Sequence, residues 1–321
     1  MAGTIGVQMI NDRKVWAAID GGGTKTHLCA CGREEQILFD KVYASTNYKA
    51  YSKEEVCAVM TAAWQEMCGK LGIDTAEVKG AVVSVAGCDS PQDETFYRTL
   101  MENLGMPSQR TFVCNDTEGI YRGMTQQKGI CLVAGTGAIA CAYDKEGQIA
   151  RAGGWGAPLS DIGSGYWIGF RILQSFLMWL DGFAIPEDPV FLLLKDQFAR
   201  ENEALPWTVS NLSVAEIASV AVTACELAYG ESCTDRGELC GHVLTDSQRC
   251  LAEHVGAVYR NSDLGDEFPL VMVGGLMGNE RFYQALQERI RQELPLCRIR
   301  FLRPDGPPAI RMLRFCQRVF R

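Results

Sequence analysis

The chain has 321 residues, 47% of them hydrophobic and 22% charged, and a formal net charge of -8. One hydrophobic core rarely fills so long a chain, so two domains are expected. The acidic balance argues against a nucleic-acid partner, whose phosphate backbone calls for clustered Lys and Arg. No apolar window reaches the roughly 18 uncharged residues of a membrane helix, and residues 1–14 lack the apolar segment of a signal peptide. We therefore expect a cytoplasmic protein that does not bind membranes.

The 14 cysteines are a high number, but their spacing favours neither a disulfide framework nor a metal site. The chain contains no C-x-x-C pair and only three histidines. Cys29 and Cys31 stand two apart on a predicted strand and should face the same side of its sheet. Cysteines of a cytosolic protein are usually small buried hydrophobic residues. Redox sensing and a metal or cluster site are the alternatives.

A strand, a glycine turn and a second strand are predicted near the start of the chain, at residues 15–20, 21–24 and 26–31. With a further strand at residues 36–39, they form an antiparallel meander. Ser52 and Glu55 have the spacing of a capping box, and apolar residues follow at helical spacing as far as Leu71.

Two buried strands are then predicted at residues 81–86 and 111–114. The first ends at Gly87 and the second at Asn115-Asp116.

The strand–glycine turn–strand pattern returns about 115 residues after its first occurrence. Its second copy consists of residues 129–134, Gly135-Thr136-Gly137, residues 138–143 and a short strand at 148–150. Beyond Ser164 the pattern is mostly helical, with a second capping box at Ser213 and Glu216. A late strand at residues 268–273 ends in two glycines. The repeat indicates a duplicated α/β fold with two related lobes.

The first glycine turn can be interpreted in several ways. A dinucleotide fingerprint requires a helix after the glycines, and a P-loop requires Gly before Lys, whereas Thr24 precedes Lys25. A β-hairpin can bind phosphate through backbone N–H groups and the Thr24 hydroxyl, or it can be a tight turn without a ligand. The second turn, at residues 135–137, favours phosphate binding, because two opposed hairpins can hold one polyphosphate from both sides.

Three aspartates are candidates for the chemistry. Asp20, at the end of the first strand, is placed to hold a hydrated Mg²⁺, with Asp161 as a second candidate; a turn-capping acid is the alternative for Asp20. Asp116 also follows a strand and suits a general base that accepts the proton of a sugar hydroxyl. Its alternative role is an Asx-turn acid that starts a helix.

The stretch from residue 153 to 169 is rich in glycine, so its backbone can approach a ligand closely. Trp155 offers an apolar face for a sugar ring, and Asp161 offers acceptors for hydroxyls. The alternative is a connector with core aromatic residues. Residues 274–277 could lie along an adenine ring or form an ordinary strand-to-helix turn.

Together these motifs resemble the N-acetylglucosamine kinase branch of the BadF/BadG/BcrA/BcrD ATPase family, over about Val15 to Asn279. The motifs are DGGGTKT at Asp20–Thr26, NDTEG at Asn115–Gly119, AGTGA at Ala134–Ala138 and GGWG…SDIGSGYWIG at Gly153–Gly169. The resemblance implies two ribonuclease-H-like, actin-like ATPase lobes with a nucleotide and sugar cleft between them. The N-terminal lobe would be residues 1–117, completed by a C-terminal helix at 304–321, and the second lobe residues 118–303.

The resemblance also implies roles for individual residues and an ATP-dependent kinase activity with ATP and Mg²⁺ as cofactors. Asp116 is the catalytic base, and Asp20 holds Mg²⁺ through water. The remaining roles are phosphate binding by Gly22, Gly23, Thr24, Lys25, Gly135, Thr136 and Gly137, adenosine binding by Gly274, Gly275 and Met277, and sugar binding by Asn47, Asp116, Gly154, Trp155 and Asp161. The expected acceptor is the 6-hydroxyl of N-acetylglucosamine, with N-acetylmuramic acid and glucosamine as alternatives. A homodimer is the oligomer considered.

Three features depart from the family pattern. Ile162 stands where a glutamate is usual, and Ala138 where a serine is common. The tail Ile310–Arg321 replaces a Gly-Ala turn and an alanine/leucine-rich helix. It can still form an amphipathic helix that packs on the first lobe through Leu313, Cys316 and Phe320, with Arg311, Arg314, Arg318 and Arg321 on the other face.

Two other functions stay open. An ATPase activator of the same family would couple ATP hydrolysis to electron transfer through an iron–sulfur cluster, which needs cysteines at a dimer interface. A non-catalytic relative would bind a sugar without turnover, as the missing glutamate and the unusual tail suggest.

Overall fold

The computed structural model describes residues 14–199, 205–230 and 238–321. Residues 1–13, most of the segment in which we predict no signal peptide, lie outside the described residues. The chain forms two compact units, the first made of residues up to Thr125 together with Pro304–Arg321, and the second of Gln126–Arg303. The boundary follows helix α3 (Asp116–Met124), eight residues beyond the boundary expected at residue 117.

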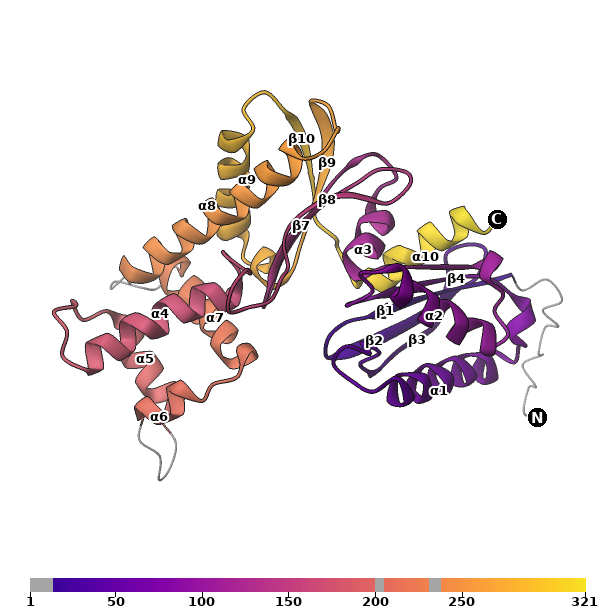
Figure 1. Ribbon diagram of the computed structural model, residues 1–321, viewed down its shortest axis with the longest axis horizontal. Coiled ribbons are helices and arrows are strands. Elements are labelled where there is room, and N and C mark those ends of the chain that lie inside the picture. Colours follow the sequence, from indigo (N-terminus) through magenta and orange to yellow (C-terminus); the bar gives the residue numbers. More distant parts are fainter. Residues whose placement is uncertain (1–13, 200–204, 231–237) are drawn as a thin grey trace, which may run out of the picture. The chain divides into compact units, whose positions relative to one another are not determined.

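The first unit contains a five-stranded sheet in the order β3-β2-β1-β4-β5 (Figure 1). Its strands are β1 (Val15–Gly21), β2 (Lys25–Cys31), β3 (Ile37–Ala44), β4 (Val78–Val85) and β5 (Thr111–Asn115). Strands β1, β2 and β3 form the predicted antiparallel meander. Strands β1, β4 and β5 are parallel, so their carboxyl ends lie at the same edge of the sheet.

Helices cover both faces of this sheet. Helices α1 (Lys53–Leu71) and α2 (Pro91–Asn103) pack on one face, in one core cluster with the alternate β1 residues Val15, Ala17 and Ile19. The predicted capping box of Ser52 and Glu55 begins α1. Short 3₁₀ turns at Thr75–Glu77 and Ser108–Arg110 precede β4 and β5.

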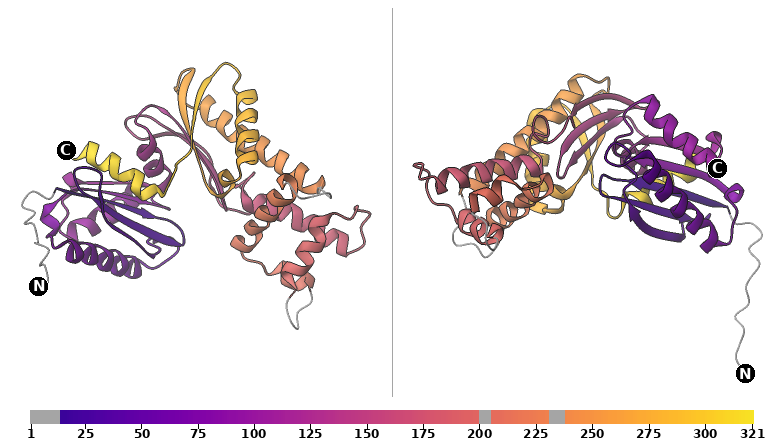
Figure 2. Two further views of the ribbon diagram at one scale, coloured as in Figure 1. Left: turned by 180° about the vertical axis from the view of Figure 1, so that it is seen from behind. Right: turned by 60° about the horizontal axis from the view of Figure 1, so that its bottom comes forward.

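The other face of the first sheet is covered by α3 and by the C-terminal helix α10 (Pro308–Val319), drawn in yellow in Figure 2. Met312, Leu313, Phe315 and Cys316 of α10 are buried in a cluster with Trp16, Ala18, Cys29, Cys31 and Val82 of the sheet. Cys29 and Cys31 therefore face the same side, as their spacing predicted. At the end of the helix, the Trp16 Nε1–H donates a hydrogen bond of 2.8 Å to the Phe320 carbonyl.

The second unit repeats this plan with the order β10-β9-β6-β7-β8. Its strands are β6 (Gly129–Ala134), β7 (Ala138–Tyr143), β8 (Gln148–Gly153), β9 (Glu267–Val273) and β10 (Arg298–Leu302). Strands β6, β7 and β8 form an antiparallel meander, and β9 and β10 continue the sheet in parallel with β6. The predicted two-lobed α/β fold with a repeated meander is confirmed.

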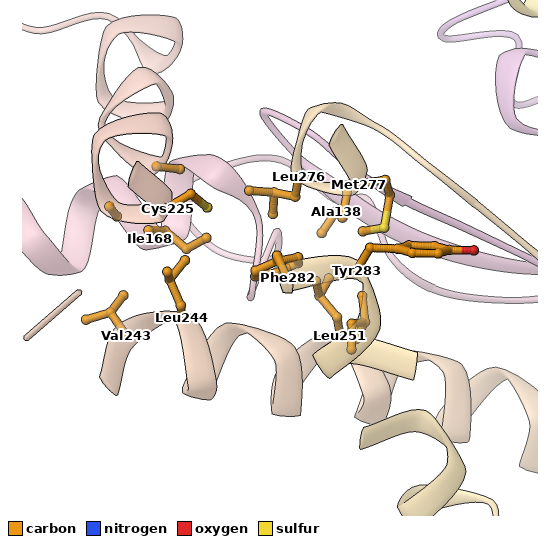
Figure 3. Packing of buried hydrophobic residues seen from close by; sticks show 14 of the residues in the cluster. Ala138, Ile168, Cys225, Val243, Leu244, Leu251, Leu276, Met277, Phe282 and Tyr283 are labelled. Carbon is orange, nitrogen blue, oxygen red and sulfur yellow. The ribbon is translucent and has the colours of Figure 1, made fainter. Parts of the chain in front are cut away.

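The helices of the second unit are α4 (Gly165–Leu180), α5 (Pro189–Phe198), α6 (Leu205–Ser210), α7 (Val214–Tyr229), α8 (Glu238–Arg260) and α9 (Glu280–Glu293), with a 3₁₀ turn, η3, at Gly275–Gly278. Helix α8 contacts β6, β7 and β8, and α4 packs against α7. Figure 3 shows part of the large core cluster that joins these helices to the sheet. No helix within the described ranges combines the length and apolar character needed to cross a membrane.

Candidate active site

Two aspartates lie at the edge where the parallel strands of the first sheet end. Asp20 belongs to the end of β1, and Asp116 is the first residue of α3, directly after β5. Burial and the charge of Asp116 raise the pKa of the Asp20 carboxyl to about 6, although His27 and Lys25 oppose the shift. Burial also raises the pKa of Asp116, against a hydrogen bond from the Thr117 backbone. The Asp116 carboxyl is therefore close enough to affect the ionisation of Asp20.

The start of α3 fixes the position of Asp116. Asn115 is the N-cap of this helix, and its Oδ1 accepts a hydrogen bond of 2.9 Å from the Thr117 N–H. The Asn115 Nδ2 donates to Asp89 Oδ1 at 2.8 Å, and Ser84 Oγ donates to the Asn115 carbonyl at 3.3 Å. Hydrogen bonds thus fix both the side-chain amide and the backbone carbonyl of Asn115, and this orients the adjacent Asp116.

The first glycine turn projects from the same end of β1. The Gly22 N–H donates to the Lys25 carbonyl at 2.9 Å, while Gly23, Thr24 and Lys25 are exposed. The turn is supported by the Ser45 hydroxyl, which donates to the Gly22 carbonyl at 2.8 Å. The backbone and the Thr24 hydroxyl of this turn are therefore accessible to a ligand.

Asn47 lies close to this turn because the Ser45-Thr46-Asn47 segment packs under it. The hydroxyls of Thr46 and Thr26 share a buried hydrogen bond of 2.8 Å, and a Cβ on Gly21 would lie 2.5 Å from Thr46 Oγ1. The Asn47 Oδ1 accepts from the Lys49 N–H at 3.0 Å and faces Gly87, whose φ is +83°. The structure thus brings Asn47 to the loop that follows β4, at the edge that also carries Asp20 and Asp116.

The second glycine turn is anchored to the start of α4. The N–H of Gly165 donates to the Gly135 carbonyl at 2.7 Å, and the N–H of Tyr166 donates to the Thr136 carbonyl at 3.1 Å. Within the turn, the Gly135 N–H donates to the Gly137 carbonyl at 2.9 Å. The side chain of Thr136 is exposed, so a ligand can reach it.

Asp161 packs directly against this second turn. A Cβ on Gly137 would lie 2.5 Å from Asp161 Oδ2, so residue 137 must be glycine for the two segments to meet. Burial raises the pKa of Asp161, opposed by backbone hydrogen bonds that include one from Gly156. Its Oδ1 is buried without a hydrogen-bond partner in the described part of the chain. Such an unpaired buried oxygen is costly unless a ligand or ion satisfies it.

Trp155 and Gly154 lie in the loop that follows β8. The Trp155 side chain is 75% exposed, and the Arg151 guanidinium lies 4.3 Å from its ring centroid. Arg151 also donates to the Gly154 carbonyl at 2.8 Å. The Trp155 indole is therefore exposed to solvent. The alternative interpretation, a connector with core aromatic residues, would require it to be buried.

A pocket of about 530 Å³ opens beside the second turn. Helix α7 forms one wall, and the second turn, the first residue of α4, η3 and the residue after it form the rest. The lining residues are Gly135, Thr136, Gly165, Ala215, Ala218, Ser219, Ala221, Val222, Cys225, Glu226, Gly275, Leu276, Gly278 and Asn279. Of the predicted adenosine residues, Gly275 lines this pocket. Met277 does not, because its side chain is buried in the core with Tyr283 and Ala138 (Figure 3).

The α7 wall was missed at the sequence level. Ala215, Ala218, Ser219 and Val222 recur at helical spacing, which is equally typical of a helix that packs in a core. The only available signal was the small size of these side chains, which leaves room for a ligand beside the helix.

The two repeated sheets and their glycine turns define a duplicated two-lobed ATPase fold. A family profile described as the BadF/BadG/BcrA/BcrD ATPase family matches residues 18–296. The chain therefore belongs to the BadF/BadG/BcrA/BcrD ATPase family.

Two relatives carry kinase names. The N-acetylmuramic acid/N-acetylglucosamine kinase of Clostridium acetobutylicum is 34% identical over 164 residues, which are 51% of this chain and 53% of that protein. The match thus spans about half of that relative's length. The N-acetyl-D-glucosamine kinase of Dictyostelium discoideum is 28% identical over 280 residues, 82% of this chain and 85% of that protein.

A solved structure shares the fold. It is that of a candidate N-acetylglucosamine kinase from Chromobacterium violaceum, with a TM-score of 0.67 and 22% identity, covering 95% of this chain and 99% of that one.

Proposed function

We propose that this protein is an ATP-dependent kinase that phosphorylates an amino sugar, with the 6-hydroxyl of N-acetylglucosamine as the first candidate acceptor. N-acetylmuramic acid and glucosamine are the alternatives. The observation that carries the proposal is the pair of half-buried carboxyls, Asp20 and Asp116, beside an exposed glycine turn at one sheet edge. The names of the two relatives support the same reaction class.

The pocket beside α7 is the proposed adenosine site. Its volume of about 530 Å³ suits a nucleoside, and it runs from the second glycine turn to η3. Gly275 would lie along the base, while the neighbouring Gly274, which does not line the pocket, would shape the turn beside it. Met277 would support this turn from the core, and Leu276 would supply the apolar contact.

Each unit contributes one glycine turn to the proposed phosphate binding. Gly22, Gly23, Thr24 and Lys25 of the first turn, and Gly135, Thr136 and Gly137 of the second, are the proposed donors. Backbone N–H groups bind phosphate oxygens without the entropy cost of ordering long side chains. Lys25 adds a positive charge.

Asp116 is the proposed general base. Its carboxylate would accept the proton of the sugar hydroxyl while the hydroxyl oxygen attacks the γ-phosphorus in line. Because burial raises the pKa of Asp116, its carboxylate is a stronger base and accepts a proton more readily. The proposed sugar-binding residues are Asn47 in the first unit and Gly154, Trp155 and Asp161 in the second, where the exposed indole offers an apolar face to a sugar ring.

The residues present fit a Mg²⁺ ion. Each unit offers carboxylate oxygens, the hard ligands that this ion prefers. Asp20, at the sheet edge of the first unit, is the proposed ligand through water, and the unpaired Oδ1 of Asp161 in the second unit is the second candidate. When bound, Mg²⁺ would neutralise phosphate charge. The chain's own contribution is to hold these carboxylates in place, through the end of β1 and through the close contact with Gly137.

The structure offers little support for the activator function. An intersubunit iron–sulfur cluster needs cysteines presented at the surface, whereas none of the thirteen described cysteines is exposed. The sugar-sensing function has one supporting observation. Ile162, at the usual glutamate position, is 43% exposed beside Asp161, so a charged group is missing from this loop.

The test is ADP release with Mg·ATP, measured by a coupled assay against N-acetylglucosamine, N-acetylmuramic acid, glucosamine, N-acetylmannosamine, glucose and no sugar. We expect release that depends on an amino sugar, with N-acetylglucosamine the best. Release without sugar would support the activator function. Sugar binding without release would support the sensor.

A homodimer in the cytoplasm is also part of the proposal. Light scattering of the purified chain tests whether it is a dimer.

A further inference from the structure

Three side chains of different chemistry converge on the antiparallel strands β2 and β3. Cys29 and Asp40 are direct partners in the strand register, and His27 lies two residues from Cys29, on the same face. His27 Nε2 is 2.6 Å from Asp40 Oδ1 and 3.2 Å from Cys29 Sγ. All three atoms lie within 4.8 Å of one another.

An ion pair alone explains only part of this cluster. It accounts for His27 and Asp40 but not for the thiol that points at the same nitrogen. A nucleophilic Cys–His–Asp arrangement is also excluded, because it requires the thiol and the acid on opposite ring nitrogens. Here both contact Nε2, and Cys29 is fully buried. A sulfur, an imidazole nitrogen and a carboxylate oxygen that surround one point are instead the donors of a transition-metal site.

We propose that His27 Nε2, Cys29 Sγ and an Asp40 carboxylate oxygen bind a thiophilic divalent metal ion, of which Zn²⁺ is the best match. Three protein ligands leave the fourth tetrahedral position to water. Binding converts the Cys29 thiol to a thiolate, whose proton passes to solvent, and displaces the His27–Asp40 hydrogen bond.

The surroundings permit the ion to enter. Asp40 has a side chain that is 48% exposed, and His27 one that is 12% exposed, so the ion would arrive from the Asp40 side. Ligands at about 2.0–2.3 Å from one zinc ion require the Asp40 oxygen to withdraw from Nε2 by roughly 1 Å. An exposed carboxylate can make this movement by rotation, while Cys29 and His27 stay fixed by the strand.

This site is separate from the proposed Mg²⁺ position. His27 pairs with Asp20 across the β1–β2 register, so the two positions are neighbours but use different side chains. Sequence spacing did not reveal the site. The third ligand, Asp40, lies on β3 and comes close to His27 and Cys29 of β2 only through the pairing of the two strands.

Cobalt titration of the reduced, metal-free full chain tests the proposal. Co²⁺ bound to a thiolate produces a charge-transfer absorption in the near ultraviolet, and we expect one equivalent to generate it and Zn²⁺ to abolish it. Cys29→Ser should remove the band. Cys31→Ser is the matched control, because Cys31 is buried on the same face but lies outside the cluster, and it should keep the band. Asp40→Asn should weaken Co²⁺ binding by about tenfold or more.

Circular dichroism checks that each variant is folded. If Cys29→Ser does not fold, the exposed Asp40→Asn variant decides the matter through its Co²⁺ affinity. The proposal is overturned if the wild-type chain shows no band, or if Cys31→Ser loses it as fully as Cys29→Ser. It is also overturned if Asp40→Asn binds Co²⁺ like the wild type.

Discussion

Single residues at strand ends and turns carry most of the candidate chemistry. Asp20 and Asp116 meet at one edge because β1 and β5 are both parallel to β4. Asp161 reaches the second glycine turn only because residue 137 has no Cβ. At each of these positions, the neighbouring backbone determines which groups the side chain can contact.

Replacing Asp116 by asparagine tests the proposed base. The amide cannot accept the hydroxyl proton, so we expect kcat to fall by about 10²–10⁴-fold, with sugar binding close to that of the wild type. Steady-state kinetics and calorimetric titration with the sugar measure the two effects. Asp196→Asn, at an exposed position on α5, is the control and should leave both unchanged. A wild-type rate for Asp116→Asn would contradict the assignment.

Replacing Asp20 by asparagine tests its ionisation. Its folded-state pKa of about 6 lies above the ordinary 3.8, so the folded chain binds this proton more tightly than the unfolded chain. The resulting stabilisation is present below pH 3.8 and is lost as the pH rises through 6. At pH 7.5, without metal, Asp20→Asn should therefore stabilise the protein by up to about 3 kcal/mol. Near pH 4, the wild type and Asp20→Asn should be equally stable.

Denaturant unfolding at both pH values, with a chelator present, measures this dependence. Asp196→Asn should follow the wild type throughout. Equal stability of wild type and Asp20→Asn at pH 7.5 would show that the Asp20 carboxyl is not desolvated as described.

Whole elements create features that no single residue carries. The pocket of the second unit exists because α7 presents small side chains toward the second turn and η3. Helix α7 is itself well defined locally, since Ser213 and Glu216 form a reciprocal cap at its start. The wall of the pocket is thus a rigid helix face, which is a favourable support for a bound nucleoside.

Filling the pocket tests its use. Val222 lines the pocket and is 61% exposed, so Val222→Trp should occupy the space without disturbing the core. We expect the Kd for ATP to rise by about tenfold or more, which corresponds to about 1.4 kcal/mol, with sugar binding unchanged. Val214→Trp, also exposed on α7 but outside the pocket, should bind ATP normally. Equal effects of the two substitutions would place the nucleotide elsewhere.

At the scale of the whole molecule, the chain leaves the first unit at Thr125 and returns to it at Pro304. Helix α10 then closes the face of the first sheet opposite α1 and α2, and Arg314 pairs with Glu35 at 2.8 Å. The unusual tail forms an amphipathic helix, and Met312 and Phe315 join the predicted Leu313 and Cys316 in its buried face. The first unit therefore depends on residues far apart in the sequence.

Removing part of the α10 core tests this dependence. Met312 is fully buried, and Met312→Ala should destabilise the first unit by about 2–5 kcal/mol. Val319→Ala, at a site on the same helix that is 45% exposed, should cost less than about 0.5 kcal/mol. Denaturant unfolding compares the two. Similar small losses would mean that α10 does not form part of the first core.

The sequence alone determined the local features of this protein. Glycine turns between apolar strands, capping boxes before α1 and α7, and strand-end aspartates are encoded within a few residues of each other. Their repetition predicted the two related sheets, because each meander has its own turn and its own alternation of buried residues. The motifs that identified the family were likewise short and continuous.

Only the tertiary structure decided what depends on distant segments. The pocket of the second unit needs α7, the second turn and η3 together. The sequence pattern of α7 is that of any packed helix. Met277 was predicted to bind adenosine from its motif, and packing places its side chain in the core. The His27, Cys29 and Asp40 cluster depends on the register of β2 with β3. Strand pairing and side-chain packing are non-local, so sequence spacing could not reveal them.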